Sequence, residues 1–561
     1  MTGEYALPPA FLLIIAGLLL PFLSGYARNF VMLLAPVTAL ILVWSLPDGP
    51  LLTIDYLGYE LVPLHVDALS RLFATVFSLA LIGGALFAFD QRKTSELTAA
   101  FIYGGGSLGV VFAGDLITVF IFSEIMAIAS SLVVWSGGAG ARAAGQRYAA
   151  IHFLAGVLLM AGVAGEAATT GSIAFEALAA DSWPRWLMLA GLLINAGAPP
   201  FTSWLADAYP KASWSGTVFL SAFTTKTAVF VLIKLFPGTE ALIYFGTFMV
   251  FYGIIFAILE NDLRRVLVYS INNQVGFMLV AIGIGSEIAL NGAAAHAFVH
   301  IVYKALMLMA AGAVLYRTGK TKATDLGGLY KTMPFTMVCG VIGALSISAF
   351  PYTSGFVAKS LITKGASDAN LGMVWYLLTA ASAGAFLYVG LKFPWFTFFH
   401  KDAGLRPQEA PVAMRFAMAM MALICLAIGI FPELLYGMMP YPVTYQPYYY
   451  AHIVAQLQLL LFSGLVFFLL LPILMPTKSL TLDFDWLYRG LGSSLKNLFD
   501  QITAALWSQI VTRVTNIVKV GFVVINRWHG PGGVFAETWP TGRMALWTTI
   551  LLGLYLLVYF L

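Results

Sequence analysis

The sequence has little charge and almost no cysteine. Only 10% of its 561 residues are charged and two are cysteine, whereas 60% are hydrophobic. Soluble domains carry about a quarter charged residues, so this composition indicates an integral membrane protein. Cys339 and Cys425 lie inside apolar stretches, and the chain has no CxxC or Cys/His spacing. This argues against iron–sulfur, c-type haem and structural zinc sites, and we expect neither a cofactor nor a metal.

The chain also lacks a block of basic residues. Its net charge of +4 is spread along the sequence, so nucleic acid is not an expected partner. The first apolar stretch, residues 7–23, has no basic residue before it and no cleavage site of small residues after it. We therefore interpret it as the first membrane span and not as a signal peptide.

Long apolar runs are abundant. A helix needs about 20 apolar residues to cross the hydrocarbon core of a bilayer. The pattern therefore predicts an all-α membrane protein of 14 to 16 spans. The sixteen candidates are residues 6–24, 28–46, 66–89, 97–113, 115–136, 148–169, 184–204, 213–236, 240–260, 265–285, 289–316, 333–364, 373–396, 414–436, 451–474 and 543–561.

Basic residues recur in alternate loops. Four of the intervening loops, 47–65, 170–183, 286–288 and 437–450, contain no lysine or arginine. Short loops rich in lysine and arginine stay on the inner side of the membrane. The alternation predicts an even number of spans with both termini outside. The residues in the basic loops are Arg28, Arg92, Lys93, Arg142, Arg147, Lys211, Arg264, Arg265, Arg317, Lys320, Lys322, Lys331, Lys401 and Arg406.

Two spans contain residues that break helices. Pro199 and Pro200 interrupt LINAGAPPFTSW, and Pro351 and Gly355 interrupt ALSISAFPYTSGFVAK. The similar tetrapeptides Pro-Phe-Thr-Ser and Pro-Tyr-Thr-Ser begin at residues 200 and 351. Interrupted spans at matching positions of two halves indicate a transport site built on inverted repeats.

Residues 490–525 have a different pattern. Polar residues such as Lys496, Asp500 and Arg513 recur at helical spacing between apolar ones. This predicts an amphipathic helix about 50 Å long that lies along the membrane boundary, a lateral helix. The segment from Asn526 to Gly532 separates it from the last span.

Ionisable residues within the apolar spans are the candidate functional residues. A charge at mid-membrane costs about 2.5–3.5 kcal/mol, so such residues usually mark a path for protons or ions. His296, His300 and Lys304 follow one another at intervals of four and therefore share a helix face. The full candidate proton relay consists of Glu124, Lys226, His296, His300, Lys304 and Lys359.

Each candidate also has a purely structural interpretation. The histidines could bond to carbonyl groups, the lysines could extend to the membrane surface, and Glu124 could be a neutral carboxyl between packed helices. Asp115, at the start of a span, is more typical of a helix cap. The run Gly104–Gly106 indicates close helix packing and not a phosphate loop, since no strand precedes it.

Several segments resemble the antiporter-like proton-channel family. This family includes the large membrane subunits of respiratory complex I, their equivalents in membrane-bound hydrogenases, and the A and D subunits of Mrp-type Na+/H+ antiporters. The resemblance covers about residues 60–440 and is greatest to the Mrp D subunits. The matching segments are FSEIMAIASS, WLADAYPKASWSGTVFLSAFTTK, ENDLRRVLVYSINNQVGFM, HAFVHIVYKALM and FPYTSGFVAK.

The resemblance implies roles for the same residues. It assigns the fifth-helix glutamate to Glu124, the eighth-helix lysine to Lys226, the central histidines and lysine to the 296–304 segment, and the exit lysine to Lys359. One position departs from the family, since its lysine on the first broken helix falls on Asn195. Asparagine carries no proton, so a Glu–Lys exchange would have to run from Glu124 to Lys226 or through water.

The resemblance implies a proton-translocating subunit of a multisubunit cation/proton antiporter in a bacterial inner membrane. Its expected partners are other membrane subunits, lipids, protons and, for an Mrp antiporter, sodium. It would be a transporter subunit and not an enzyme on its own. A pumping subunit of a quinone oxidoreductase or hydrogenase, and an energy-coupling subunit for inorganic carbon uptake, are the alternatives. A solute carrier acting alone is disfavoured, since no span offers a polar cluster the size of a substrate.

These interpretations predict six regions. They are residues 1–96 for N-terminal helices, 97–236 and 240–396 for two half-channel repeats, 397–475 for C-terminal helices, 476–530 for the lateral helix region and 531–561 for the final span.

Overall fold

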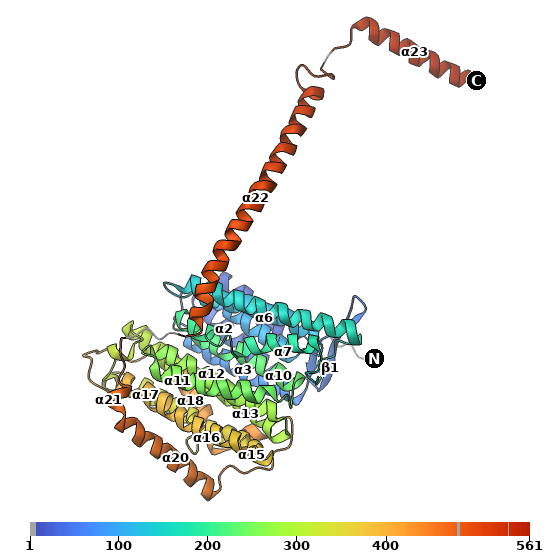
Figure 1. The fold of residues 1–561 in the computed structure, drawn as a ribbon. Helices are drawn as coiled ribbons and strands as arrows, with labels where there is room; N and C mark the ends of the chain where they lie inside the picture. The colour runs from blue at the N-terminus through green and yellow to red at the C-terminus, as the bar shows by residue number, and fades with distance from the viewer. Residues whose placement is uncertain (1–6, 479–482, 537) are drawn as a thin grey trace. The chain divides into compact units, whose positions relative to one another are not determined.

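The computed structural model describes residues 7–478, 483–536 and 538–561. Residue 6, where the first predicted span begins, and the first two residues of TLDFDWLYRG lie outside this range. The chain divides into two compact units, Met1–Asp485 and Trp486–Leu561. Thirteen helices in the described ranges are long and apolar enough to cross a membrane, and Pro9–Phe22 and Pro334–Ile347 are shorter apolar helices. This confirms a multi-pass helical membrane protein (Figure 1).

The N-terminal part of the first unit contains a β-hairpin between helices. The sequence predicts a loop over residues 47–65, but most of this segment forms two antiparallel strands in which Gly49 pairs with Val66 and Tyr56 with Tyr59. Leu57 and Gly58 connect them, both with positive φ, the geometry of a tight hairpin turn. The elements here are α1 (Pro9–Leu19), η1 (Leu20–Phe22), α2 (Gly25–Ser45), β1 (Gly49–Tyr56), β2 (Tyr59–Val66) and α3 (Ala68–Phe87).

The next segment contains the first broken helix. α7 ends at Ala196, as the prolines predict, and the chain resumes helical structure at Trp204. Asp115 caps α5 by accepting the Thr118 amide at 2.7 Å, which confirms its structural interpretation. The elements are α4 (Thr94–Val111), α5 (Leu116–Trp135), α6 (Ala141–Thr170), α7 (Trp183–Ala196), α8 (Trp204–Ala208), η2 (Tyr209–Lys211), α9 (Gly216–Ala222) and α10 (Thr224–Leu235).

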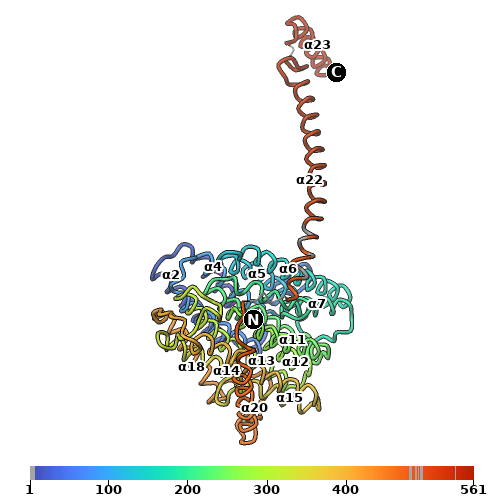
Figure 2. Tube along the Cα trace, turned by 60° about the vertical axis from the view of Figure 1, so that its left-hand side comes forward, coloured from blue at the N-terminus to red at the C-terminus, as the bar shows by residue number. Residues whose placement is uncertain are grey.

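The central helix of the first unit is α13, which packs against α3, α9, α10, α12, α14, α15 and α18. Figure 2 labels α13 together with its neighbours α12, α14, α15 and α18. The second broken helix, α14 and α15, is interrupted between Ile347 and Ser354, as predicted. The elements are α11 (Ala241–Leu259), α12 (Leu263–Ile284), α13 (Glu287–Thr318), η3 (Ala323–Asp325), η4 (Leu329–Lys331), α14 (Pro334–Ile347), α15 (Ser354–Asp368), α16 (Gly372–Ala385), η5 (Phe386–Leu391), α17 (Lys392–Pro394) and η6 (Trp395–Phe399).

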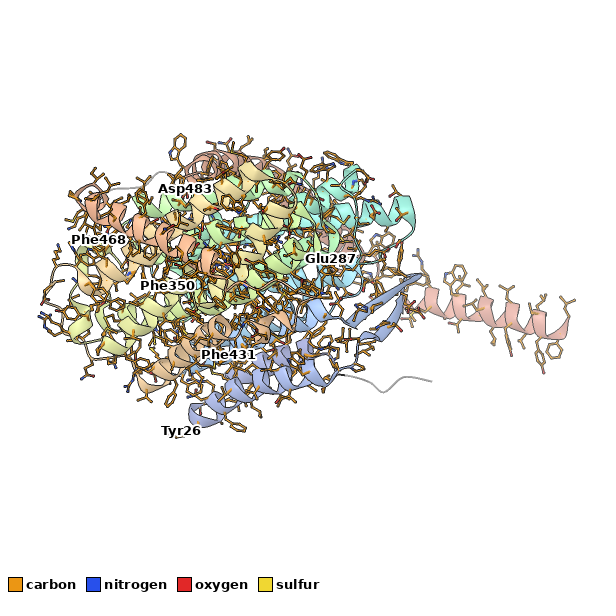
Figure 3. The ribbon with its side chains drawn as sticks, turned by 90° about the horizontal axis from the view of Figure 1, so that it is seen from below. Tyr26, Glu287, Phe350, Phe431, Phe468 and Asp483 are labelled. Carbon is orange, nitrogen blue, oxygen red and sulfur yellow. The ribbon has the colours of Figure 1, made fainter. Side chains whose placement is uncertain are left out.

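Asp483 fastens the end of the first unit to its body. Its carboxylate accepts hydrogen bonds from the hydroxyls of Tyr252 in α11, at 2.7 and 2.8 Å, and Tyr269 in α12, at 2.7 Å. Figure 3 labels Asp483 and also Phe350, which lies in the second helix break. The remaining elements of this unit are α18 (Val412–Ile430), α19 (Glu433–Tyr436), α20 (Tyr450–Leu469) and α21 (Leu471–Leu474).

The second unit, from Trp486 onward, contains α22 (Asp485–His529), apart from its first residue, and α23 (Thr541–Phe560). The amphipathic segment 490–525 is helical, as predicted, within the longer α22. By length and composition alone, Asn497–His529 would also be able to cross a membrane. Its placement along the membrane boundary therefore stays a prediction.

Candidate functional site

One face of α12 holds the polar side chains of α13. Lys304 Nζ donates to the hydroxyl of Ser270 and, at 3.2 Å, to the carbonyl of Leu267. One turn further along α12, Gln274 Oε1 lies 3.1 Å from His296 Nε2 and accepts the Tyr303 hydroxyl at 3.1 Å. The lysine and the histidine are thus anchored to successive turns of one buried helix.

His300 lies between these two anchored residues on α13 and has no such anchor. Its ring is parallel to that of His296, with the centroids 6.2 Å apart. Both of its ring nitrogens are buried, and neither finds a hydrogen-bond partner within the described residues. Buried polar atoms are usually bonded to protein or to ordered water, so this ring offers two hydrogen-bonding positions for water. In the neutral ring one of these two nitrogens is able to accept a proton.

Lys359 continues the array from α15. Its Nζ donates to the carbonyl of Ile347 at 2.8 Å, a group that the second helix break leaves without an intrahelical partner. The same ammonium lies 4.9 Å from the centroid of Phe277, three residues beyond Gln274 on α12. α12 therefore contacts all three of Lys304, His296 and Lys359.

A cavity of about 340 Å³ adjoins Lys359. One water molecule needs roughly 10–15 Å³ of cavity volume, so this cavity has room for many water molecules. Its walls come from α15, α16 and α20 and from the segment before α20. The polar residues among them include Ser360, Thr363, Tyr445, Tyr449, His452 and Gln456.

Lys226 lies beside an interruption between α9 and α10. Its Nζ donates to the carbonyl of Ser221 at 2.7 Å and to the hydroxyl of Thr225 at 3.0 Å. The Tyr103 hydroxyl accepts the Thr224 amide at 2.8 Å and so stabilises the interruption. The buried lysine is therefore held by neutral oxygens, and no carboxylate in the described part of the chain forms an ion pair with it.

Lys234, two turns further along α10, provides a contrast. Its Nζ bonds to the carboxylate of Asp67 at 2.7 Å. Burial alone would raise the pKa of Asp67, but Lys234 and the Ser70 amide outweigh burial and lower that pKa. Lys234 is thus fixed in an ion pair, whereas Lys226 is not.

Glu124 faces α6 and not a lysine. No ion pair joins it to a basic residue in the described part of the chain. Its Oε1 lies so close to the backbone of Gly156 that a Cβ at that position would overlap it. A cavity of about 30 Å³ connects Glu124 with His152 and Asn195 and is also lined by Thr227, next to Lys226. The first half of the chain therefore brings Glu124 and Asn195 together around space for about two waters.

His152 and Lys392 are among the buried ionisable residues that the sequence analysis missed. His152 Nδ1 lies 2.7 Å from Asn195 Oδ1. Lys392 Nζ donates to the carbonyls of Ala257, Ile258 and Glu260 at 3.0, 2.7 and 2.7 Å, so it caps the end of α11. Both lie within apolar runs, and that is the same signal that identified Lys226 and Lys304.

Gly156 provides a test of the position of Glu124. We expect Gly156→Ala to push the Glu124 carboxyl out of the small cavity, because the new Cβ would occupy its place. Proton transport by membrane vesicles should fall about tenfold, which corresponds to roughly 1.4 kcal/mol. Gly138→Ala, where nothing lies within 4 Å of the new Cβ, is the matched control. Equal rates for both variants would contradict this placement of Glu124.

The fold and the site define a polytopic membrane protein with a buried array of titratable side chains. The family described as "NADH:quinone oxidoreductase/Mrp antiporter, TM" matches residues 113–386. The D subunit of the Na(+)/H(+) antiporter of Alkalihalophilus pseudofirmus is 30% identical over 339 residues, which cover 55% of this chain and 68% of that relative. The chain belongs to this family of membrane proteins.

Two further relatives come from different assemblies. The N subunit of the NADH-quinone oxidoreductase of Desulforudis audaxviator is 29% identical over 62% of this chain and 70% of its own length. The A/B subunit of a probable K(+)/H(+) antiporter of Rhizobium meliloti is 28% identical over 66% of this chain. The aligned region spans only 40% of that relative.

Two solved structures share the fold. A chain of the Mrp complex from Dietzia sp. aligns with a TM-score of 0.68 at 23% identity, covering 78% of this chain and 95% of that one. A chain of an archaeal membrane-bound sulfane sulfur reductase aligns with a TM-score of 0.71 at 21% identity, covering 98% of this chain and 99% of that one. At these identities the likeness establishes the fold.

Proposed function

We propose that the protein is a proton-translocating subunit of a multisubunit cation/proton antiporter. The observation that carries this proposal is the buried array along α12 and α13, in which Lys304, His296 and Lys359 contact successive turns of one helix. Charges are costly at this depth and are retained mainly where protons or ions move. The relay consists of Glu124, Lys226, His296, His300, Lys304 and Lys359.

The two cavities support a pair of half-channels. The small one lies against the first broken helix and contains Glu124, and the large one lies against the second and contains Lys359. We assign them to residues 97–236 and 240–396, related as inverted repeats. The large cavity is lined by residues of the segment 437–450, which lacks lysine and arginine, so we place its opening on the outer side.

The transfer steps require only small energies. Moving one charge across 100 mV is worth about 2.3 kcal/mol, which is comparable to the effect of a nearby charge on a buried amine. Loading Lys304 would therefore favour release from Lys359. The antiporter relatives favour Na+ or K+ as the exchanged cation. The proposed partners are the other membrane subunits of the complex. The proposed location is a bacterial inner membrane, with both termini on the outer side.

Transport by the whole complex tests this function. The assay uses inverted membrane vesicles that contain this chain with its neighbouring subunits. We expect a preformed pH gradient across these vesicles to dissipate when Na+ or K+ is added. A pH-sensitive dye measures the dissipation, and vesicles without this chain are the control. The fold shared with a sulfane sulfur reductase chain favours one alternative, a redox-driven pump. Acidification on adding an electron donor, with no response to cations, would establish that alternative and reject the antiporter.

A further inference from the structure

His152 occupies an enclosed position on α6. Its side chain is 3% exposed. The Tyr148 ring lies 4.1 Å from its centroid and the Trp204 ring 4.6 Å. A cation over the face of an aromatic ring gains about 0.5–2 kcal/mol, whereas the ring edge carries partial positive charge. Tyr148 and Trp204 are thus the aromatic neighbours that the imidazole has in either protonation state.

The hydrogen bond of His152 sets which nitrogen exchanges a proton. Asn195 Oδ1 accepts hydrogen bonds only, so the nitrogen 2.7 Å away, Nδ1, carries a hydrogen. Nε2 of the neutral ring then holds the lone pair. That atom is buried, and it has no hydrogen-bond partner in the described ranges. An imidazole held in this way has one free position for a proton.

The carboxyl of Glu124, a proton donor, and the imidazole of His152, a proton acceptor, line the same cavity. His152, Glu124, Asn195, Thr224 and Thr227 all line the space of about 30 Å³. Gly156, one turn after His152 on α6, provides the room for the Glu124 carboxyl. Three further titratable side chains belong to the surroundings of this cavity. The Tyr148 ring contacts His152, the Tyr209 ring lies 6.3 Å from that of Tyr148, and Lys226 is adjacent in sequence to Thr227, which lines the cavity.

We propose that His152, positioned by Asn195, carries the proton between Glu124 and Lys226. In the transfer, the O–H bond of neutral Glu124 breaks and an N–H bond forms at His152 Nε2 through an intervening water. The products are a carboxylate and an imidazolium. The imidazolium then gives up the Nε2 proton through water near Thr227 toward Lys226, and Nδ1 keeps its hydrogen bond to Asn195 throughout.

This inference rests on the proposed function, and one set of variants separates the two. His152→Gln keeps an amide near Asn195 but binds no proton, and we expect at least a tenfold loss of cation-driven proton release in vesicles of the full complex. Adding Asn195→Lys to that variant should restore the rate to within about threefold of wild type, because the amine lines the same cavity. His400→Gln, at a loop position away from the array, is the matched control.

The outcomes are distinguishable. If His152→Gln transports at the wild-type rate while Lys226→Ala abolishes transport, the relay stands and the role of His152 is rejected. If neither variant slows transport, both are rejected. Should His152→Gln prevent assembly, His152→Lys keeps a proton carrier in place and is expected to retain at least a third of the wild-type rate. Loss of transport in that variant, in an assembled complex, would reject the proposal.

A spectroscopic measurement tests the proton on His152 without relying on transport. Infrared difference spectra of the complex across a pH titration should contain an imidazolium band that is missing in His152→Gln. In Glu124→Gln the midpoint of that band should shift by at least half a pH unit, because the neighbouring charge is lost. A merely structural histidine would leave the midpoint unchanged, and that result overturns the inference.

Discussion

Replacing Lys304 or Lys226 by alanine is expected to reduce cation-coupled proton transport at least a hundredfold, while the complex still assembles. Each lysine is buried and, among the residues that the structure describes, bonds to hydroxyl and carbonyl oxygens alone. Alanine therefore removes a proton-binding amine without leaving a buried carboxylate unpaired. The cavity costs up to a few kcal/mol, but the removal of a buried ammonium offsets part of that loss.

A lysine-to-arginine change separates charge from proton exchange. Arginine keeps the positive charge but does not release its proton in proteins, so Lys304→Arg should be nearly as inactive as Lys304→Ala. The measurements are dye-detected proton release by vesicles and the yield of purified complex. Lys320→Ala, at an exposed loop position, serves as the control. Near wild-type transport in both alanine variants would refute the relay.

Gly355→Ala is expected to prevent folding of the second broken helix. A Cβ at position 355 would overlap the carbonyl oxygen of Ser346 and lie 2.9 Å from its carbon. Both atoms belong to the backbone of α14, so no side-chain rotation can relieve the overlap. Overpacking of this kind costs about 3 kcal/mol or more. The shift would also displace Lys359, one turn further along α15.

The yield and thermal stability of the purified complex measure this effect. We expect Gly355→Ala to lose most of the assembled protein, and any remainder should transport slowly. Gly372→Ala is the matched control, because a Cβ at that helix start has nothing within 4 Å. If Gly355→Ala purified with wild-type stability, α14 and α15 would have to pack less closely than the structure indicates.

The fold class and the two helix breaks could be predicted because each has a local cause. Apolar runs of membrane length define spans, and Pro199, Pro200 and Pro351 cannot continue a helix. The hairpin between Gly49 and Val66 was missed because its local signals are atypical of a hairpin. Its turn places Leu57 at positive φ, where asparagine or glycine is typical, and Pro50 and Pro63 lie within its strands.

The candidate site could be predicted only in part. Burial of an ionisable residue is visible in the sequence, but the partner of that residue is not. The interruption at Phe223 contains no proline or glycine and therefore gives no local signal in the sequence. The Tyr103 hydroxyl that stabilises it comes from a helix distant in the sequence. His152 was overlooked because the role proposed for it depends on its proximity to Asn195 and Glu124, and this proximity arises only in the folded protein. The roles of all these residues in transport stay predictions.

The hydrogen bonds from Tyr252 and Tyr269 to Asp483 have a mechanical consequence. Tyr269, which holds the polypeptide leading into α22, immediately precedes Ser270, which holds Lys304. The same turn of α12 therefore bonds both to Asp483 and to the amine of Lys304. A pull on Asp483 would act on the stretch of backbone that positions this amine.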